Sequence, residues 1–316
     1  MLGLMQDRPL LISSMIEFAA SYYPDVEIVT RTVEGPIHRY GYKDAAKRAK
    51  QVAEALQGLG IKLGDRIGTL AWNTHRHFEL YFGISGLGAV LHTINPRLAP
   101  DHVAYIANHA EDQIIFVDLN LLPIVEGVFP HLKTVKHVVV MTDRAHMPAS
   151  SKIPNLLCYE ELIAGKPGTL RWPDFDEKTA SSLCYTSGTT GNPKGVLYSH
   201  RSTVLHAMMS SNGAVIPMNP DTTVLPVVPM FHANAWGLVY ASPICGAKMV
   251  FPGPKLDGAS IYELLDKEQV TLSAGVPTVW LALLDYCAQN KLKMSSVKRT
   301  LIGGSAVPIS MISRFW

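Results

Sequence analysis

Short apolar runs and amphipathic segments alternate along most of this 316-residue chain. Arg66–Ala71, Ala89–Thr93 and Ile114–Asp118 have the length and apolar content of buried strands. Each is followed by a longer segment whose apolar residues recur at helical spacing. A strand–helix–strand repeat of this kind predicts a mostly parallel sheet that is covered by helices on both faces. The chain is therefore expected to be an α/β protein.

The same periodicities place the other elements. Helices are expected at Leu10–Tyr22, Tyr42–Leu59, Arg76–Leu87, Asp101–Ala110, Leu121–Val128, Ser199–Asn212, Trp236–Gly246, Ile261–Glu268 and Pro277–Asn290. Further strands are expected at Glu27–Thr32, His38–Tyr42, Val135–Met141, Thr223–Val227, Lys248–Phe251, Leu272–Val276 and Thr300–Gly303. The polar stretch Arg144–Pro154, and the chain after it as far as Asp176, is expected to be irregular. The cluster His75–His77 is expected at a helix start, and Arg97 at a turn.

Composition excludes several functional classes. The formal net charge is +2, so charge implies neither nucleic acid nor an anionic membrane as a partner. The four cysteines are far apart and form no CxxC pair, so neither a zinc site nor a disulfide framework is expected. The most apolar region, Val224–Phe251, is interrupted by prolines and polar residues and is expected to be buried core and not a membrane span. No secretory signal is recognised at the N-terminus.

One loop carries the chemistry. Leu183–Gly195 reads LCYTSGTTGNPKG, and it combines glycines, hydroxyls and one ammonium group without a bulky or acidic interruption after Tyr185. Such a loop can bring backbone N–H groups, hydroxyls and a positive charge close to a polyphosphate. It is not a Walker A loop, because Pro193 precedes Lys194 and Gly195 follows it. The alternative is a Ser/Thr/Gly-rich surface turn between strands.

With four other blocks, this loop resembles the adenylate-forming superfamily of acyl-CoA synthetases, luciferases and peptide-synthetase adenylation domains. The blocks are GLGAVLHTINPRL (86–98), PVVPMFHANAW (226–236), SAGVPTVW (273–280) and GGSAVP (303–308). The similarity is greatest to bacterial medium- and long-chain fatty-acid–CoA ligases, including those that act on methylthio-alkanoates. The resemblance implies an acyl-CoA synthetase-like N-terminal domain: two doubly wound, mostly parallel sheets with helices between and outside them.

The resemblance also implies a two-step reaction. A carboxylate attacks the α-phosphorus of ATP to give an acyl adenylate and pyrophosphate, and the thiol of CoA then takes the acyl group and releases AMP. The β- and γ-phosphates, bridged by Mg²⁺, are expected to contact Thr186, Ser187, Gly188, Thr189, Thr190 and Lys194. Thr186 is also expected beside the Mg²⁺ ion. Lys194 and His232 are the expected catalytic residues.

Other residues are implied to form the acyl and adenine sites. His232, Trp236 and Gly303 are expected at the acyl pocket, with Trp236 closing a fatty-acid tunnel. Gly303, Gly304 and Ser305 are expected against adenine. Each has an alternative interpretation. His232 could be a hydrogen-bonded core histidine, Trp236 an ordinary buried aromatic residue, and Gly303–Ser305 part of a bulged edge strand.

The chain ends at Trp316, within an expected helix that begins near Pro308, and the family's sequence pattern continues beyond that point. Residues 1–316 are therefore expected to be an incomplete N-terminal adenylate-forming domain, with approximate halves 1–180 and 181–316. The mobile C-terminal domain, a Mg²⁺-binding glutamate, a ribose-binding aspartate and a second lysine have no counterparts in the sequence. We expect weak ATP binding and slow or absent turnover by this chain alone.

Three functions stay open on sequence alone. The first is ATP-dependent activation of a medium- to long-chain fatty acid to its CoA thioester. The second is the same chemistry on a short sulfur-containing acid, such as a methylthio-alkanoate, or on an aryl acid. The third is a non-catalytic nucleotide-binding or dimerisation fragment. A homodimer is expected from the long-chain relatives, and a role in fatty-acid supply suggests a cytoplasmic location without a stable membrane anchor.

Overall fold

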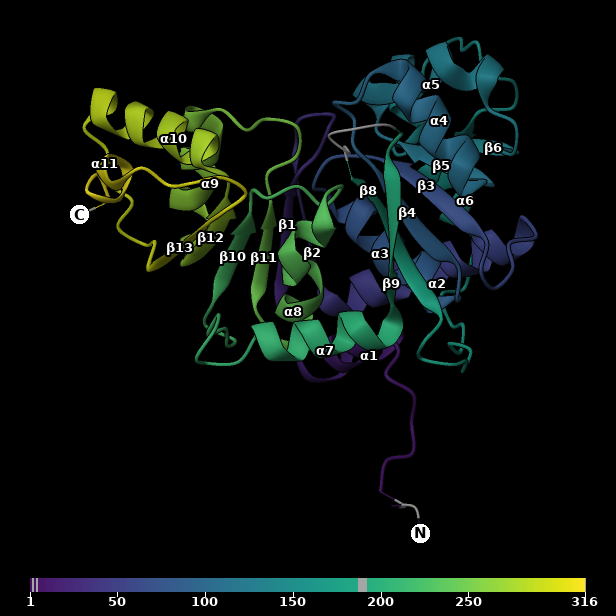
Figure 1. Ribbon diagram of the computed structural model, residues 1–316, viewed down its shortest axis with the longest axis horizontal. Coiled ribbons are helices and arrows are strands. Elements are labelled where there is room, and N and C mark those ends of the chain that lie inside the picture. The colour runs from purple at the N-terminus through teal and green to yellow at the C-terminus, as the bar shows by residue number, and fades with distance from the viewer. Residues whose placement is uncertain (2, 4, 187–191, 316) are drawn as a thin grey trace.

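The computed structural model describes residues 1, 3, 5–186 and 192–315 (Figure 1). The strands are β1 (Glu27–Arg31), β2 (Ile37–Gly41), β3 (Arg66–Leu70), β4 (Val90–Ile94), β5 (Ile114–Val117), β6 (His137–Val140), β7 (Leu157–Cys158), β8 (Ala180–Thr186), β9 (Lys194–Ser199), β10 (Thr223–Pro226), β11 (Lys248–Phe251), β12 (Leu272–Gly275) and β13 (Arg299–Ile302). The α-helices are α1 (Ser13–Tyr22), α2 (Tyr42–Gly58), α3 (His75–Gly86), α4 (Pro100–Ala110), α5 (Leu122–Val128), α6 (Tyr159–Ile163), α7 (His200–Ser210), α8 (Leu238–Cys245), α9 (Gly258–Lys267), α10 (Pro277–Asn290) and α11 (Ile309–Ile312). Short 3₁₀ segments are η1 (Leu119–Leu121), η2 (Phe129–His131), η3 (Arg144–His146) and η4 (Ala233–Gly237).

The strands of the described residues form two sheets. One has the order β13-β12-β10-β11-β1-β2 and the other β7-β6-β5-β3-β4-β8-β9. Within the described part of the chain, every neighbouring pair is parallel except β1–β2 and β8–β9, which are antiparallel. The prediction of an α/β fold with two mostly parallel sheets is confirmed.

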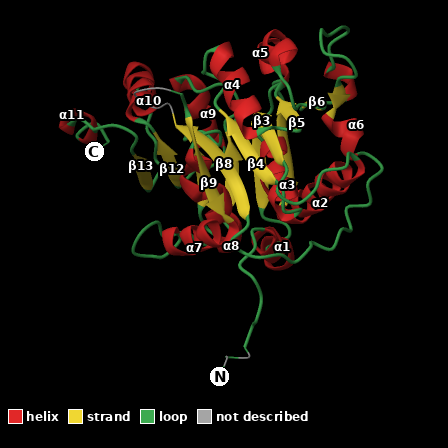
Figure 2. Cartoon of the chain, turned by 45° about the vertical axis from the view of Figure 1, so that its right-hand side comes forward, coloured by secondary structure: helices red, strands yellow, loops and turns green. Residues whose placement is uncertain are grey.

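Helices fill the space between the sheets and cover their outer faces (Figures 1 and 2). The alternation along β5 shows how one strand serves two layers: Ile114 and Phe116 belong to the central core, whereas Ile115 and Val117 pack with α4 and α5 outside. Helix α3 is buried along its whole length and belongs to the central layer. Helices α9 and α10 cover the outer face of the first sheet.

Most predicted elements lie within a few residues of their expected bounds, and the exceptions have local causes. Helix α1 begins at Ser13 and not at Leu10, and the backbone N–H groups of Leu10 and Ile12, in the segment before it, donate to Glu177 and His200. The prediction that residues 144–176 are irregular was wrong for β7 and α6. Strand β9 was not predicted either, since its first residues, Lys194 and Gly195, have loop-like composition.

The prediction of one helix over Trp236–Gly246 was wrong at its beginning. Residues Ala233–Gly237 have left-handed backbone angles, and right-handed helix starts only at Leu238. The helix α3 does start at His75, as predicted for the polar cluster there, and the Thr74 side chain accepts a hydrogen bond from His77 N–H at this N-terminus.

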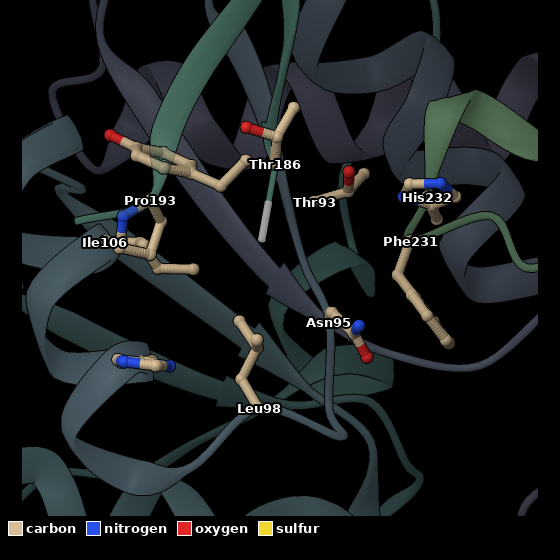
Figure 3. Close-up of a pocket in the computed structure, with 10 residues that line it drawn as sticks. Thr93, Asn95, Leu98, Ile106, Thr186, Pro193, Phe231 and His232 are labelled. Atoms are coloured by element: carbon tan, nitrogen blue, oxygen red, sulfur yellow. The ribbon is translucent and has the colours of Figure 1, made fainter. Parts of the chain in front are cut away.

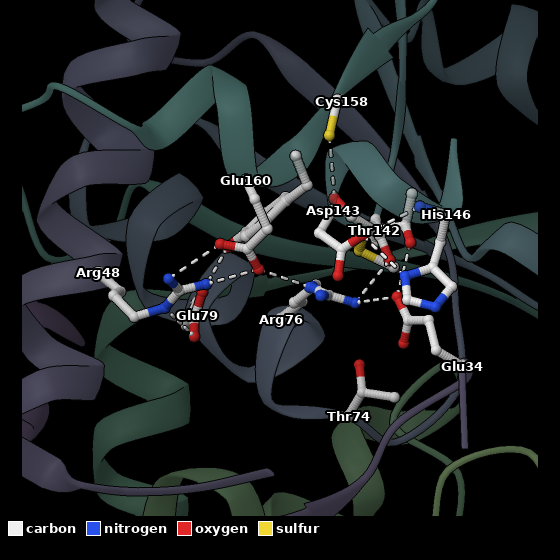
Figure 4. Close-up of polar contacts among 12 residues, drawn as sticks. Glu34, Arg48, Thr74, Arg76, Glu79, Thr142, Asp143, His146, Cys158 and Glu160 are labelled. Atoms are coloured by element: carbon white, nitrogen blue, oxygen red, sulfur yellow. Dashed lines mark hydrogen bonds and ion pairs between the residues drawn. The ribbon is translucent and has the colours of Figure 1, made fainter. Parts of the chain in front are cut away.

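A buried network of charges joins the two sheets through α3 (Figure 4). The Arg76 guanidinium contacts Glu34 in the β1–β2 hairpin at 2.7 Å and Glu160 on α6 at 2.8 Å. Arg48 on α2 contacts Glu160 at 3.0 Å and Glu79 at 2.8 Å. Burial raises the pKa of Glu34, but the Thr142 hydroxyl and the charge of Arg76 outweigh it, so the net shift is downward. Glu34 is therefore a charged partner of Arg76.

None of the described helices combines the length and the apolar content that a membrane crossing requires.

Candidate functional site

The site lies at the edge where the parallel strands β4 and β8 end. A cavity of about 140 Å³ opens there (Figure 3). It is lined by Thr93, Asn95, Leu98, His102, Ile106, Tyr185, Thr186, Pro193, Phe231 and His232. Ligands of open α/β sheets bind outside the carboxyl ends of the strands, so this cavity is where the fold favours a substrate. Arg97, at the turn before α4, lies with its guanidinium carbon 5.8 Å from the centre of the Phe231 ring.

The β8–β9 hairpin supplies the polar wall of this cavity. Thr186, the last residue of β8, is in register with Lys194, the first residue of β9, and its hydroxyl donates to the Lys194 carbonyl oxygen at 3.4 Å. Thr186 lines the cavity, whereas Lys194 is exposed beside the lining residue Pro193. The predicted phosphate-loop residues Ser187, Gly188, Thr189 and Thr190 lie outside the described residues.

Aromatic and acidic side chains from neighbouring elements pack around Tyr185, near the end of β8. Burial raises the pKa of Tyr185 to about 12, so its hydroxyl keeps its proton and can donate it to Nδ1 of His109, 2.6 Å away. The buried carboxylate of Asp112 lies 2.7 Å from Nδ1 of His92 on β4. Burial raises the pKa of Asp112, although His92 opposes that shift. The His92 ring packs on Tyr185 with their centres 5.1 Å apart, so this contact and the His109 hydrogen bond hold Tyr185 at the start of the hairpin.

The segment after β10 forms the opposite wall. Asn73, at the carboxyl end of β3, donates from Nδ2 to the carbonyl oxygens of Pro226 and Val228 at 2.8 and 2.9 Å. Its Oδ1 accepts from Met230 N–H at 2.7 Å. Asn73 was not predicted as a site residue. The signal was an asparagine two residues after a predicted parallel strand, where a buried side-chain amide can hydrogen-bond to the backbone of a neighbouring loop. His232 follows this segment, is exposed, and faces the cavity.

A left-handed turn follows His232. Residues 233–237 have φ values of 45°, 53°, 49°, 55° and 76°, and only the last is glycine. A side chain in this conformation costs roughly 1–2 kcal/mol per residue, least for asparagine, so the turn needs support from its surroundings. Asn234 provides part of that support, since its Nδ2 donates to the Ser182 hydroxyl on β8 at 3.1 Å.

Trp236 and Gly303 lie against each other. A Cβ atom added to Gly303 would stand 3.0 Å from Cη2 of the Trp236 indole, so only glycine permits this approach without displacing the ring. Gly304 has φ of 82° and, with Ser305, is exposed after β13. Neither Trp236 nor these three residues line the 140 Å³ cavity. The structure thus brings Thr186 and His232 to one cavity, and pairs Trp236 with Gly303 at a second place on the same turn.

The model of the AMP-binding enzyme family matches residues 16–316. The chain belongs to this family. Over its whole length it is 50% identical to the 3-methylmercaptopropionyl-CoA ligase of Ruegeria lacuscaerulensis, and 47% identical to the medium-chain-fatty-acid–CoA ligase of Ectopseudomonas oleovorans. It spans 58% of the length of each. Among solved structures, it is similar in fold to the anthranilate CoA ligase AuaEII in complex with anthranoyl-AMP. That likeness has a TM-score of 0.86 at 23% identity and covers 99% of this chain and 59% of that one.

Family membership confirms the resemblance that the sequence blocks carried. It also confirms the acyl-CoA synthetase-like N-terminal architecture, because this AMP-binding family member superimposes along almost its whole length on a structure of that class.

Proposed function

We propose that this AMP-binding protein takes part in the ATP-dependent conversion of an aliphatic carboxylic acid to its CoA thioester through an acyl adenylate. The observation that carries the proposal is the pairing of two walls at one cavity: the Thr186–Lys194 hairpin end on one side and the His232 segment on the other. Names of relatives that share about half of its residues support the same chemistry.

Each wall has a distinct task in the proposal. The Thr186 hydroxyl and the Lys194 ammonium contact the β- and γ-phosphates and neutralise the charge that grows as pyrophosphate leaves. The loop residues Ser187–Thr190 are proposed to add further donors. His232 faces the carboxylate as it attacks the α-phosphorus, and it orients that group and the new adenylate without taking a proton. The acyl chain is proposed to extend past Trp236 and Gly303, with the adenine near Gly304 and Ser305.

A magnesium ion fits this site only through the nucleotide. The described residues contain no group of three histidine, cysteine, aspartate or glutamate side chains placed to hold a metal, and Thr186 offers a single hydroxyl. Bound Mg²⁺ would supply charge neutralisation on the phosphates. Thr186 would contribute one oxygen to its shell.

The acid is proposed to be a medium- to long-chain fatty acid. A second candidate is a short methylthio-alkanoate, and the Ruegeria relative, whose name gives a 3-methylmercaptopropionyl product, favours it specifically. CoA is the proposed acyl acceptor, and a cytoplasmic homodimer is the proposed assembly.

A panel of acids tests both candidates. Acid-dependent ATP–pyrophosphate exchange measures the first step, and AMP release with CoA measures both. The panel should contain butyrate, octanoate, palmitate, benzoate and 3-methylthiopropionate, with the Ruegeria relative as a positive control. Exchange that rises with octanoate or palmitate supports the first candidate, and a preference for 3-methylthiopropionate supports the second. If no acid stimulates exchange or AMP release while the control enzyme is active, this chain alone is not a ligase.

A further inference from the structure

The strained turn Ala233–Gly237 contains one buried polar side chain, Asn234, which does not line the cavity. Asn234 is buried within the turn, and its amide group reaches two other elements. Nδ2 donates to the Ser182 hydroxyl on β8 at 3.1 Å. Oδ1 lies 3.3 Å from the Tyr81 hydroxyl on α3 and 3.9 Å from the Cys184 sulfur on β8. The amide therefore has partners on both of its ends.

The partners of Asn234 are themselves fixed. The Tyr81 hydroxyl shares its single proton between the carbonyl oxygen of Met230 and Oδ1 of Asn234, so it contacts the chain on both sides of His232. Cys184 is held in β8 between β4 and β9. Strand β8 continues directly to Thr186. Asn234 therefore joins the turn Ala233–Gly237, which follows His232, to the strand that leads into the proposed phosphate loop.

The identity of the residue agrees with this task. Asparagine is among the few residues with a side chain that adopt the left-handed conformation readily, and it also carries both a donor and an acceptor. The two alanines and the tryptophan beside it have neither property. A strained backbone persists only where its surroundings determine it. In this turn the Asn234 amide contacts Ser182, Tyr81 and Cys184, and the Cys184 sulfur also accepts hydrogen bonds from the backbone N–H groups of Ala233 and Asn234.

We propose that Asn234 is a positioning residue. Its amide holds the left-handed turn in place, and the turn sets where His232 faces the cavity and where Trp236 meets Gly303. Without the amide, the turn relaxes toward ordinary backbone angles and both side chains move, whereas β8 keeps its place through its own sheet pairing. The proposal rests on the proposed function for its catalytic consequence, but its structural part can be tested without activity.

The structural test uses ¹⁹F NMR of protein labelled with 5-fluorotryptophan. The chain has five tryptophans, and the signal lost in Trp236→Phe identifies Trp236. Asn234→Gly keeps the backbone freedom but loses the amide, and Asn234→Ala loses both. Both variants are expected to shift or broaden the Trp236 signal and to leave the Trp172 and Trp280 signals unchanged. Asn155→Ala is the matched control, because Asn155 also has a positive φ of 52° but is exposed and remote in sequence.

If Asn234→Ala does not fold, Ser182→Ala and Tyr81→Phe each remove one partner of the amide and are expected to move the same signal. A Trp236 signal that stays in place in every folded variant overturns the proposal.

The kinetic test compares the effect of the substitution on the acid substrate with its effect on ATP. In acid-dependent ATP–pyrophosphate exchange, Asn234→Gly should lower kcat/KM for the acid on the order of 10²-fold, the loss typical of a misplaced reacting group. The KM for ATP should change less than about threefold, since β8 stays in place. An equal rise in both KM values indicates general damage and overturns the positioning role. If the parent protein shows no exchange, the proposed function fails, and the ¹⁹F spectra alone decide the role of Asn234.

Discussion

Replacing Arg76 with methionine is expected to destabilise the protein by about 3–5 kcal/mol, because the change leaves a buried carboxylate without its partner. The side chain of Glu34 is 5% exposed, and that of Arg76 is 10% exposed. After the substitution, Glu34 keeps the Thr142 hydroxyl at 2.6 Å and a hydrogen bond from its own backbone N–H, but no positive charge. Glu160 loses less, since Arg48 still contacts it at 3.0 Å. The expected loss therefore arises mainly at Glu34.

A double variant isolates that cause. Arg76→Met combined with Glu34→Gln removes both charges, so it should recover at least about 1.5 kcal/mol relative to Arg76→Met alone. Urea unfolding followed by circular dichroism measures each free energy of unfolding. Lys267→Met is the control, because Lys267 and its partner Glu263 are 68% and 48% exposed, and such a pair contributes about 0.5 kcal/mol or less.

The pH dependence supplies a second check. In the parent, the lowered pKa of Glu34 contributes stability above its ordinary value of 4.5, and that stability is lost as the pH falls through the folded-state pKa. In Arg76→Met, burial is opposed only by the hydrogen bonds from Thr142 and the Glu34 backbone, with no positive charge, so the pKa of Glu34 should rise. The difference in free energy of unfolding between the parent and Arg76→Met should then become smaller as the pH falls from 7 to 4. A variant within 1 kcal/mol of the parent at pH 7, or a double variant as unstable as the single one, refutes the reasoning.

Three further predictions concern the site and the core. Lys194→Ala should weaken ATP binding in calorimetry at least about tenfold, the loss expected for one charged hydrogen bond, whereas Lys178→Ala at the other end of β8 should not. Gly303→Ala places a Cβ 3.0 Å from the Trp236 ring, so it should change the order of acids in the exchange assay and change the KM for the acid more than the KM for ATP. Burial lowers the pKa of His77 to about 4, so this residue stays neutral in the folded protein, and its share of stability falls by about 3 kcal/mol as the pH drops from 6.5 to below 4. His77→Gln should flatten the unfolding free energy over that range, and an unchanged profile would exclude this cause.

Local sequence patterns were sufficient for much of the fold. Helices α2 and α10 and strand β11 have strong periodicity or clear ends, and their predicted bounds hold to within a residue. Pairing between distant strands has no such local signal. Strand β1 joins β11, with Thr30 opposite Phe251, and the contacts that hold the two strands together, including the Lys248–Glu27 ion pair at 2.9 Å, form only in the folded chain.

The candidate site also contains some residues that local sequence patterns could predict and others that depend on distant contacts. Thr186, Lys194 and His232 belong to blocks with recognisable composition, so the sequence could indicate them and the structure places them near one cavity. Asn73 acts through hydrogen bonds to a segment at least 153 residues away in the sequence. Asn234 donates a hydrogen bond to Ser182, 52 residues away. Alanines 233 and 235 have no intrinsic preference for left-handed angles, so the turn is imposed by tertiary contacts and could not be predicted from local pattern.

A crystal structure of the protein grown with ATP and magnesium at millimolar concentration tests the central claim most directly. The account predicts the triphosphate against Thr186 and Lys194, with the α-phosphate facing the cavity that His232 lines. A nucleotide bound elsewhere on the molecule, with this cavity and the hairpin end untouched, would contradict it.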